Sequence, residues 1–190
     1  MAKKKIKKVK DKKKTSSTRK VAVRKVKKKV AKKNAKSKKK VLATPKGYHS
    51  VTPYLIVKGA AQAIDFYKKV LGAKVAMLFE KSDQMVAHAE LKIGDAKIML
   101  ADECLERGVR SPQHVGGTPV NIHLYVKNVD DVVEKAVAHD AKLIRPVENM
   151  FYGDRAGFIE DPFGHQWFIS THVEDVSPAK VKKRMAELYG

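Results

Sequence analysis

The sequence predicts an α+β protein in which two βαβββ modules form a cleft, preceded by a disordered basic tail. Three observations carry this prediction. The net positive charge is confined to the first quarter of the chain, and a strand–helix–three-strand pattern then occurs twice. The segment TPYLIVK at 52–58 also aligns with NIHLYVK at 121–127, with Leu, Val and Lys at the same three offsets. A duplicated unit of this length implies two modules packed about a pseudo-twofold axis.

The tail and its linker span residues 1–46, which carry 23 Lys and Arg but one acid, Asp11, for a net charge of +22. The other 144 residues have a net charge of −1. Like charges repel and little apolar surface can be buried, so we expect this segment to be disordered. Its Lys density predicts non-specific nucleic-acid binding driven by counterion release. A solubilising arm is the alternative, and RNA or an acidic membrane surface could replace DNA. The predicted phosphate contacts are Lys3, Lys4, Lys5, Lys7, Lys8, Arg19, Arg24, Lys27, Lys28, Lys29, Lys38, Lys39 and Lys40.

The domain is expected at 47–176, with its first module at about 50–103. Residues 51–57 are typical of a strand. Residues 60–71 place Ile64, Tyr67 and Val70 on one helical face, and Gly72 is expected to end the helix. Three strands follow at about 74–80, 85–93 and 96–101, with a turn at 81–83.

The second module is expected at about 118–172. It has a strand at 119–126, a helix with an acidic first turn at 130–139, and strands near 141–145, 152–160 and 165–171. Asp161-Pro162-Phe163-Gly164 has turn chemistry between the last two strands. A C-terminal helix is expected within 177–190, with Ser177 as N-cap and Pro178 at the first helical position.

Composition also excludes several classes of protein. With one cysteine, Cys104, the chain has no intrachain disulfide, which fits a reducing compartment. No apolar run approaches the roughly 20 residues needed to cross a membrane. We therefore expect a cytoplasmic protein, with nucleoid or nuclear association as the alternative that the tail suggests.

Several motifs together resemble one known superfamily. AIDFYKKVLGA follows the first strand, and FYGDR (Phe151–Arg155), DPFGHQW (Asp161–Trp167) and TH-ED (Thr171–Asp175) follow near the end. These segments, on paired βαβββ modules, resemble the vicinal oxygen chelate superfamily of glyoxalase I, extradiol dioxygenases and bleomycin- and fosfomycin-resistance proteins. The PhnB-like branch is the most similar. The resemblance covers about residues 48–176 and implies a small-molecule site in the cleft. We also expect a homodimer.

In metal-dependent members of that superfamily, the first and last strands of both modules supply the ligands. The resemblance places these positions at Thr52, Met99, Asn121 and Phe168. They offer a hydroxyl, a thioether, an amide and a phenyl ring, whereas divalent cations need carboxylate or imidazole ligands. We therefore expect no metal at the usual site, no other cofactor and no ordinary glyoxalase I activity. Another lyase, isomerase or dioxygenase reaction stays open.

Alternation along the strands predicts which polar groups line the cleft. Glu90 is the candidate general base, with its pKa raised by an apolar wall that includes Met99 and Phe168. His88 or His123 is the candidate acid or orienting group. One alternative is a simple His88–Glu90 pair on the strand face, and another is a displaced metal site made by these three residues.

Other residues are predicted to bind a ligand. Arg155 could clamp a carboxylate or phosphonate, or form an ion pair with Asp154, Glu160 or Asp161. Trp167 and Ile169 are expected in the core, and His165 is expected to hydrogen-bond the turn. The full ligand-binding set is Tyr54, Asn121, Tyr125, Tyr152, Arg155, Gln166 and Phe168.

Two functional hypotheses follow. The first is an enzyme or sequestering protein that acts on a small polar or anionic molecule. The second is a catalytically inactive interaction protein whose domain dimerises or recruits a partner while the tail binds DNA or RNA.

Overall fold

The computed structural model describes residues 41–81 and 84–190, and residues 44–190 form one compact unit. The predicted disorder of residues 1–40 and all the predicted phosphate contacts, Lys3 to Lys40, lie outside the described residues, as do Ser82 and Asp83 of the predicted turn. Within the described ranges, no helix is long and apolar enough to cross a membrane.

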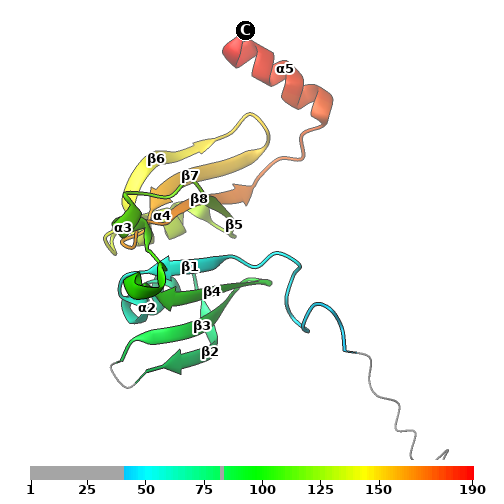
Figure 1. The fold of residues 1–190 in the computed structure, drawn as a ribbon. Helices are drawn as coiled ribbons and strands as arrows, with labels where there is room; N and C mark the ends of the chain where they lie inside the picture. Colours follow the sequence, from blue (N-terminus) through cyan, green and yellow to red (C-terminus); the bar gives the residue numbers. More distant parts are fainter. Residues whose placement is uncertain (1–40, 82–83) are drawn as a thin grey trace, which may run out of the picture. The chain divides into compact units, whose positions relative to one another are not determined.

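The first module contains β1 (Tyr54–Val57), α2 (Ala60–Val70), β2 (Lys74–Glu80), β3 (Val86–Ile93) and β4 (Ala96–Asp102), shown in Figure 1. Its sheet has the order β1-β4-β3-β2, with β1 parallel to β4 and the other pairs antiparallel. The Asp102 carboxylate accepts hydrogen bonds from the backbone N–H groups of Gly59 and Ala60, at 2.9 and 2.8 Å. It thereby satisfies free donors at the start of α2. Gly72, with φ 64°, follows the helix end as predicted.

The second module repeats this connectivity with β5 (Asn121–Tyr125), α4 (Val129–Val137), β6 (Lys142–Asn149), β7 (Asp154–Glu160) and β8 (Gln166–His172). Its sheet order is β5-β8-β7-β6, the counterpart of the first. The predicted duplication is therefore confirmed. The side chain of Asn128 accepts hydrogen bonds from the N–H groups of Asp130 and Asp131 and caps α4, a role that we did not predict.

Two short elements join the modules, a 3-10 turn η1 (Leu105–Arg107) and α3 (Pro112–Val115), and neither was predicted. After β8 the chain continues into α5 (Pro178–Tyr189). Ser177 accepts a hydrogen bond from the N–H of Lys180 at 3.4 Å, so the predicted N-cap is confirmed.

The helix-covered faces of both sheets share one hydrophobic core. The ring centroids of Tyr67 and Trp167 are 5.5 Å apart, and those of Phe66 and Phe163 are 6.2 Å apart. Trp167 is 1% exposed and Ile169 is fully buried, which confirms both as core residues. The opposite face of each sheet points away from this core. We call these the first open face (Tyr54, His88, Glu90, Met99) and the second open face (Asn121, His123, Tyr125, Phe158, Phe168).

Asp161 organises the turn between β7 and β8. Its buried carboxylate accepts hydrogen bonds from the Tyr67 hydroxyl at 2.7 Å and from Trp167 Nε1 at 2.8 Å. It also accepts from the backbone N–H groups of Phe163 and His165, both at 2.9 Å. His165 thus bonds the turn as predicted, but its ring Nε2 lies 3.1 Å from the carbonyl oxygen of Ile56 on β1. The polar residues of this turn, Asp161 and His165, therefore have structural contacts with α2, β8 and β1.

Candidate functional site

Glu90 lies on the first open face and is 6% exposed. The Tyr48 hydroxyl donates a hydrogen bond to its Oε2, and Lys97 Nζ lies 3.2 Å from the same atom. The Lys97 ammonium also lies 3.8 Å above the centre of the Tyr48 ring. Tyr48 and Lys97 together cover the carboxylate.

These contacts lower the pKa of Glu90, chiefly through the Tyr48 hydrogen bond. Burial opposes the shift, and Lys97 and His88 reinforce it. The predicted rise in the Glu90 pKa is therefore wrong, because donors reach the carboxylate where we expected an apolar wall. An acid with a lowered pKa accepts a proton less readily, which weakens the case for Glu90 as a general base.

His88 lies beside Glu90 on β3. Its Nε2 is 3.7 Å from Glu90 Oε1, and its Nδ1 is 3.2 Å from the Tyr54 hydroxyl. The His88 ring also stacks on Phe79, with centroids 6.4 Å apart. The His88–Glu90 pair of the simpler alternative is present.

His123 is not brought to this pair. Within residues 41–81 and 84–190, no hydrogen bond, ion pair or ring contact joins it to His88 or Glu90. It lies instead in an aromatic ladder across the second open face. Stacked rings run from Tyr125 to His123 (4.8 Å), from His123 to Phe168 (5.9 Å) and from Phe168 to Phe158 (4.4 Å).

Arg145, on β6, lies over one end of this ladder. Its guanidinium carbon is 4.9 Å from the Phe168 ring centre and 5.4 Å from that of Phe158. Aromatic faces attract a cation in this position. Arg145 is exposed, and in the described part of the chain no carboxylate pairs with it. We did not identify it from the sequence, because the irregular β6–β7 pairing determines that it lies opposite Phe158.

Arg155 lies on the helix-covered side of the second sheet, against α4. Its Nε and Nη2 donate to the two carboxylate oxygens of Asp130 on α4, at 2.8 and 2.6 Å. This hydrogen-bonded pairing lowers the pKa of Asp130. The three predicted ion-pair partners, Asp154, Glu160 and Asp161, are therefore wrong, and the predicted anion clamp is already engaged by a helix.

The other predicted ligand contacts are dispersed. Asn121 and Gln166 are neighbours across the β5–β8 pair, on the second open face. Tyr54 is on the first open face. Tyr152 is half-buried against Phe151, with ring centroids 5.3 Å apart, and burial raises its pKa.

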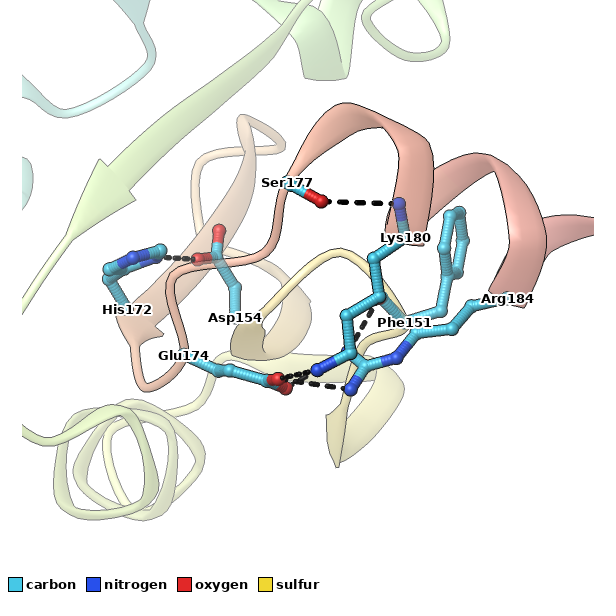
Figure 2. Close-up of polar contacts among 7 residues, drawn as sticks. All are labelled: Phe151, Asp154, His172, Glu174, Ser177, Lys180 and Arg184. Atoms are coloured by element: carbon cyan, nitrogen blue, oxygen red, sulfur yellow. Dashed lines mark hydrogen bonds and ion pairs between the residues drawn. The ribbon is translucent and has the colours of Figure 1, made fainter.

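A cluster centred on Asp154 was missed, since we assigned His172 no role. The buried Asp154 carboxylate accepts a hydrogen bond from the Tyr125 hydroxyl at 2.9 Å. It also pairs with His172 Nδ1 at 2.7 Å (Figure 2). His172 Nε2 lies 3.1 Å from Asp175. These two carboxylates, Asp154 first, raise the pKa of His172. The FYGDR and TH-ED motifs contain these groups and were the available signal.

The residues that the resemblance places at the metal positions differ from the ligands that divalent cations prefer. Met99 pairs with Tyr54 in the β1–β4 register, and Phe168 pairs with His123 in the β5–β8 register. With Thr52 and Asn121, they supply neither carboxylate nor imidazole. Among the described residues, no three or more His, Cys, Asp or Glu side chains are placed to hold a metal ion. No chemistry is therefore assigned to a metal at these positions.

Comparison with solved structures supports the same fold. A gene product of Arabidopsis thaliana has a TM-score of 0.53 at 24% identity, covering 65% of this chain and 98% of its own. The PhnB protein of Bacillus cereus has a TM-score of 0.52 at 16% identity, with 65% and 99% covered. A fosfomycin resistance protein of Listeria monocytogenes, solved with Mn(II) and sulfate, has a TM-score of 0.51 at 16% identity, with 76% and 99% covered.

Sequence comparison identifies the family. An uncharacterised protein of Mycobacterium bovis is 36% identical over 140 residues, which cover 72% of this chain and 92% of that relative. The model of the Glyoxalase/Bleomycin resistance protein/Dioxygenase superfamily matches residues 47–169. The chain therefore belongs to the glyoxalase/bleomycin resistance protein/dioxygenase superfamily.

Proposed function

We propose that the domain binds a small anionic molecule on its second open face, without a metal at the usual family positions. The observation that carries this proposal is Arg145, an exposed cation held over Phe158 and Phe168 with no carboxylate partner in the described ranges. A carboxylate or phosphonate would gain charge-assisted hydrogen bonds from its planar guanidinium. The apolar part of the ligand would contact the edges of the aromatic ladder.

Ser170 adds a second reason. It lies between Tyr125 and Ala156 in the strand register, on the same face as Phe168. Its Oγ is buried and has no hydrogen-bond partner among the described residues. Buried polar groups are usually paired, so this hydroxyl has hydrogen-bonding capacity for a ligand atom once the side chains that cover it move apart.

A homodimer is part of the same proposal. The two open faces leave large aromatic side chains in solvent, with Tyr54 51% and Tyr125 61% exposed, and Phe79, which pairs with His88 across the β2–β3 ladder, is 57% exposed. Exposed aromatic surface of this kind favours contact with another molecule. A second copy that covers these faces would enclose the ligand. Light scattering of the purified protein should give twice the 21.2 kDa chain mass.

Calorimetric titration with phenylphosphonate, an aromatic dianion, tests the binding proposal. Arg145→Ala should weaken its binding about tenfold or more, the loss expected for one charge-assisted hydrogen bond. The control Arg110→Ala removes another exposed arginine and should leave affinity unchanged. Equal affinity of the two variants would reject this site. Elemental analysis of the same protein tests the expectation of no bound metal.

We infer separately that the tail binds nucleic acid non-specifically, because its +22 charge contrasts with −1 for the rest. Duplex DNA binding of the full chain should fall by roughly a thousandfold or more between 50 and 200 mM salt, as expected for six or more phosphate contacts. A variant lacking residues 2–46 should not bind at 50 mM salt. If DNA binding is lost on deletion and no phenylphosphonate binding is detected, the inactive interaction protein becomes the better hypothesis.

A further inference from the structure

An open cavity of about 740 Å³ lies where the ends of the two modules meet. It shares Tyr125 with the second open face, and Tyr125 is the one residue of its lining that we predicted as a ligand contact. Residues from both modules line it: Leu71, Ile93, Gly94, Leu124, Tyr125, Val126, Lys127, Thr171 and His172.

Most of this lining is apolar. Leu71 and Ile93 come from the first module, and Leu124 and Val126 from the second. The Thr171 hydroxyl is occupied, because it donates to the Val126 carbonyl at 3.1 Å and accepts from the Val129 N–H at 2.9 Å. The basic groups of the lining are the Lys127 ammonium and the His172 imidazole.

The two ring nitrogens of His172 face two different carboxylates. Its Nδ1 is held by Asp154, which is 4% exposed and also held by the Tyr125 hydroxyl. Its Nε2 faces the Asp175 carboxylate, and the Asp175 side chain is fully solvent-exposed. Exposed ion pairs contribute little stability. The Asp175 carboxylate is therefore easily replaced, and its contact with Nε2 marks where the acid group of a ligand can bind.

We propose that this cavity binds an aliphatic carboxylate, with its hydrocarbon chain against Leu71, Ile93, Leu124 and Val126 and its carboxylate on His172 Nε2. Lys127 supplies a second positive charge at the cavity wall. Burial of the chain provides the free energy of binding, and the imidazolium selects for an acid over a neutral molecule. This site is separate from the proposed anion site at Arg145.

Binding should depend on pH in a definite direction. The groups around the imidazole are Asp154 on β7, Asp175 after β8, Tyr125 on β5 and Lys127 after β5. The two carboxylates raise the pKa of His172 above 6.5. The charged imidazolium is therefore favoured at low pH and is lost as the pH rises through this raised pKa. Octanoate should bind more tightly near pH 6 than near pH 9.

Calorimetric titration of the full chain with octanoate near pH 6 tests the site. Octanamide, which has the same chain without the charge, should bind about tenfold more weakly or worse. His172→Gln should lower octanoate affinity about tenfold. Asp175→Asn should raise it severalfold, because the competing carboxylate is removed. His139→Gln changes a half-buried histidine outside the cavity and should have no effect.

Three results would overturn the proposal. They are equal affinity for octanoate and octanamide, no gain with Asp175→Asn, or equal affinity of the His172→Gln and His139→Gln variants. Arg145→Ala should leave octanoate binding intact. Loss of octanoate binding in that variant would place the carboxylate at the other site, so the two proposals fail separately.

Discussion

The phenol hydroxyl of Tyr67 donates a hydrogen bond of 2.7 Å to Oδ2 of Asp161, which joins the helix of the first module to the last hairpin of the second. Both residues are buried, and burial first, then the Asp161 charge, raises the pKa of Tyr67 well above 10.0. The hydroxyl therefore stays protonated as a donor at neutral pH. This contact therefore fixes the β7–β8 turn of the second module against α2 of the first module.

Replacing Tyr67 by Phe should lower the free energy of unfolding by about 1–3 kcal/mol, because a buried carboxylate loses one donor. Urea denaturation at 25 °C measures the change. Tyr189→Phe, at a side chain that is 75% exposed, is the matched control and should be neutral. If both variants are equally stable, this contact is not important for stability.

Gly153→Ala should detach the C-terminal segment from the domain. Gly153 has φ 104°, and an added methyl group would overlap the backbone carbonyl oxygen of Glu174. The Gly153 carbonyl also accepts hydrogen bonds from the N–H groups of Val173 and Glu174, at 3.0 and 2.9 Å. Amide hydrogen exchange should increase across residues 173–189. Gly72→Ala, at φ 64° with open space around it, is strained without this overlap and should leave exchange there unchanged.

Acid should loosen the docking of α5. Glu174 receives Lys180 Nζ at 2.6 Å and both terminal nitrogens of Arg184, at 2.9 and 3.0 Å (Figure 2). Arg184 first, then Lys180, lowers the pKa of Glu174 from 4.5 to about 2. Because the folded-state pKa is lowered, this contribution is complete above pH 4.5 and is lost as pH falls towards about 2.

Exchange of the α5 amides, measured across that pH range, should show the loss. At neutral pH, Glu174→Gln should produce similar loosening, since it removes the carboxylate charge. Glu187→Gln is the control, because Glu187 pairs at 3.9 Å with Lys183 within the same helix. Loosening of equal size in both variants would mean that the Glu174 contacts do not anchor α5.

Arg155→Ala should destabilise the domain without affecting phenylphosphonate binding. The guanidinium bonds both carboxylate oxygens of Asp130 and so joins β7 to α4. Its removal leaves Asp130 without its cation, and the thermal midpoint should fall. Asp130→Asn should lower it similarly, and the double variant should add little more. A large loss of phenylphosphonate affinity would restore Arg155 as a ligand contact.

Much of the fold could be predicted because it depends on local patterns. The period-two alternation of β8 placed Trp167 and Ile169 in the core, and the helical spacing of Ile64, Tyr67 and Val70 identified the buried face of α2. The site was predicted less well. Arg145 and Arg155 are both arginines on neighbouring strands, and nothing local indicates which one has an acidic partner.

The sequence by itself determined the two modules, the faces of their strands, the resemblance to the superfamily and the separation of charge between tail and domain. Only the tertiary structure determined which residues contact the side chains of the candidate sites. Glu90 has a lowered pKa because Tyr48, 42 residues away, and Lys97 reach its carboxylate. Register shifts in the β6–β7 pair bring Arg145 opposite Phe158. The physical reason is that strand periodicity encodes the face of a side chain, whereas its charge environment comes from residues distant in sequence.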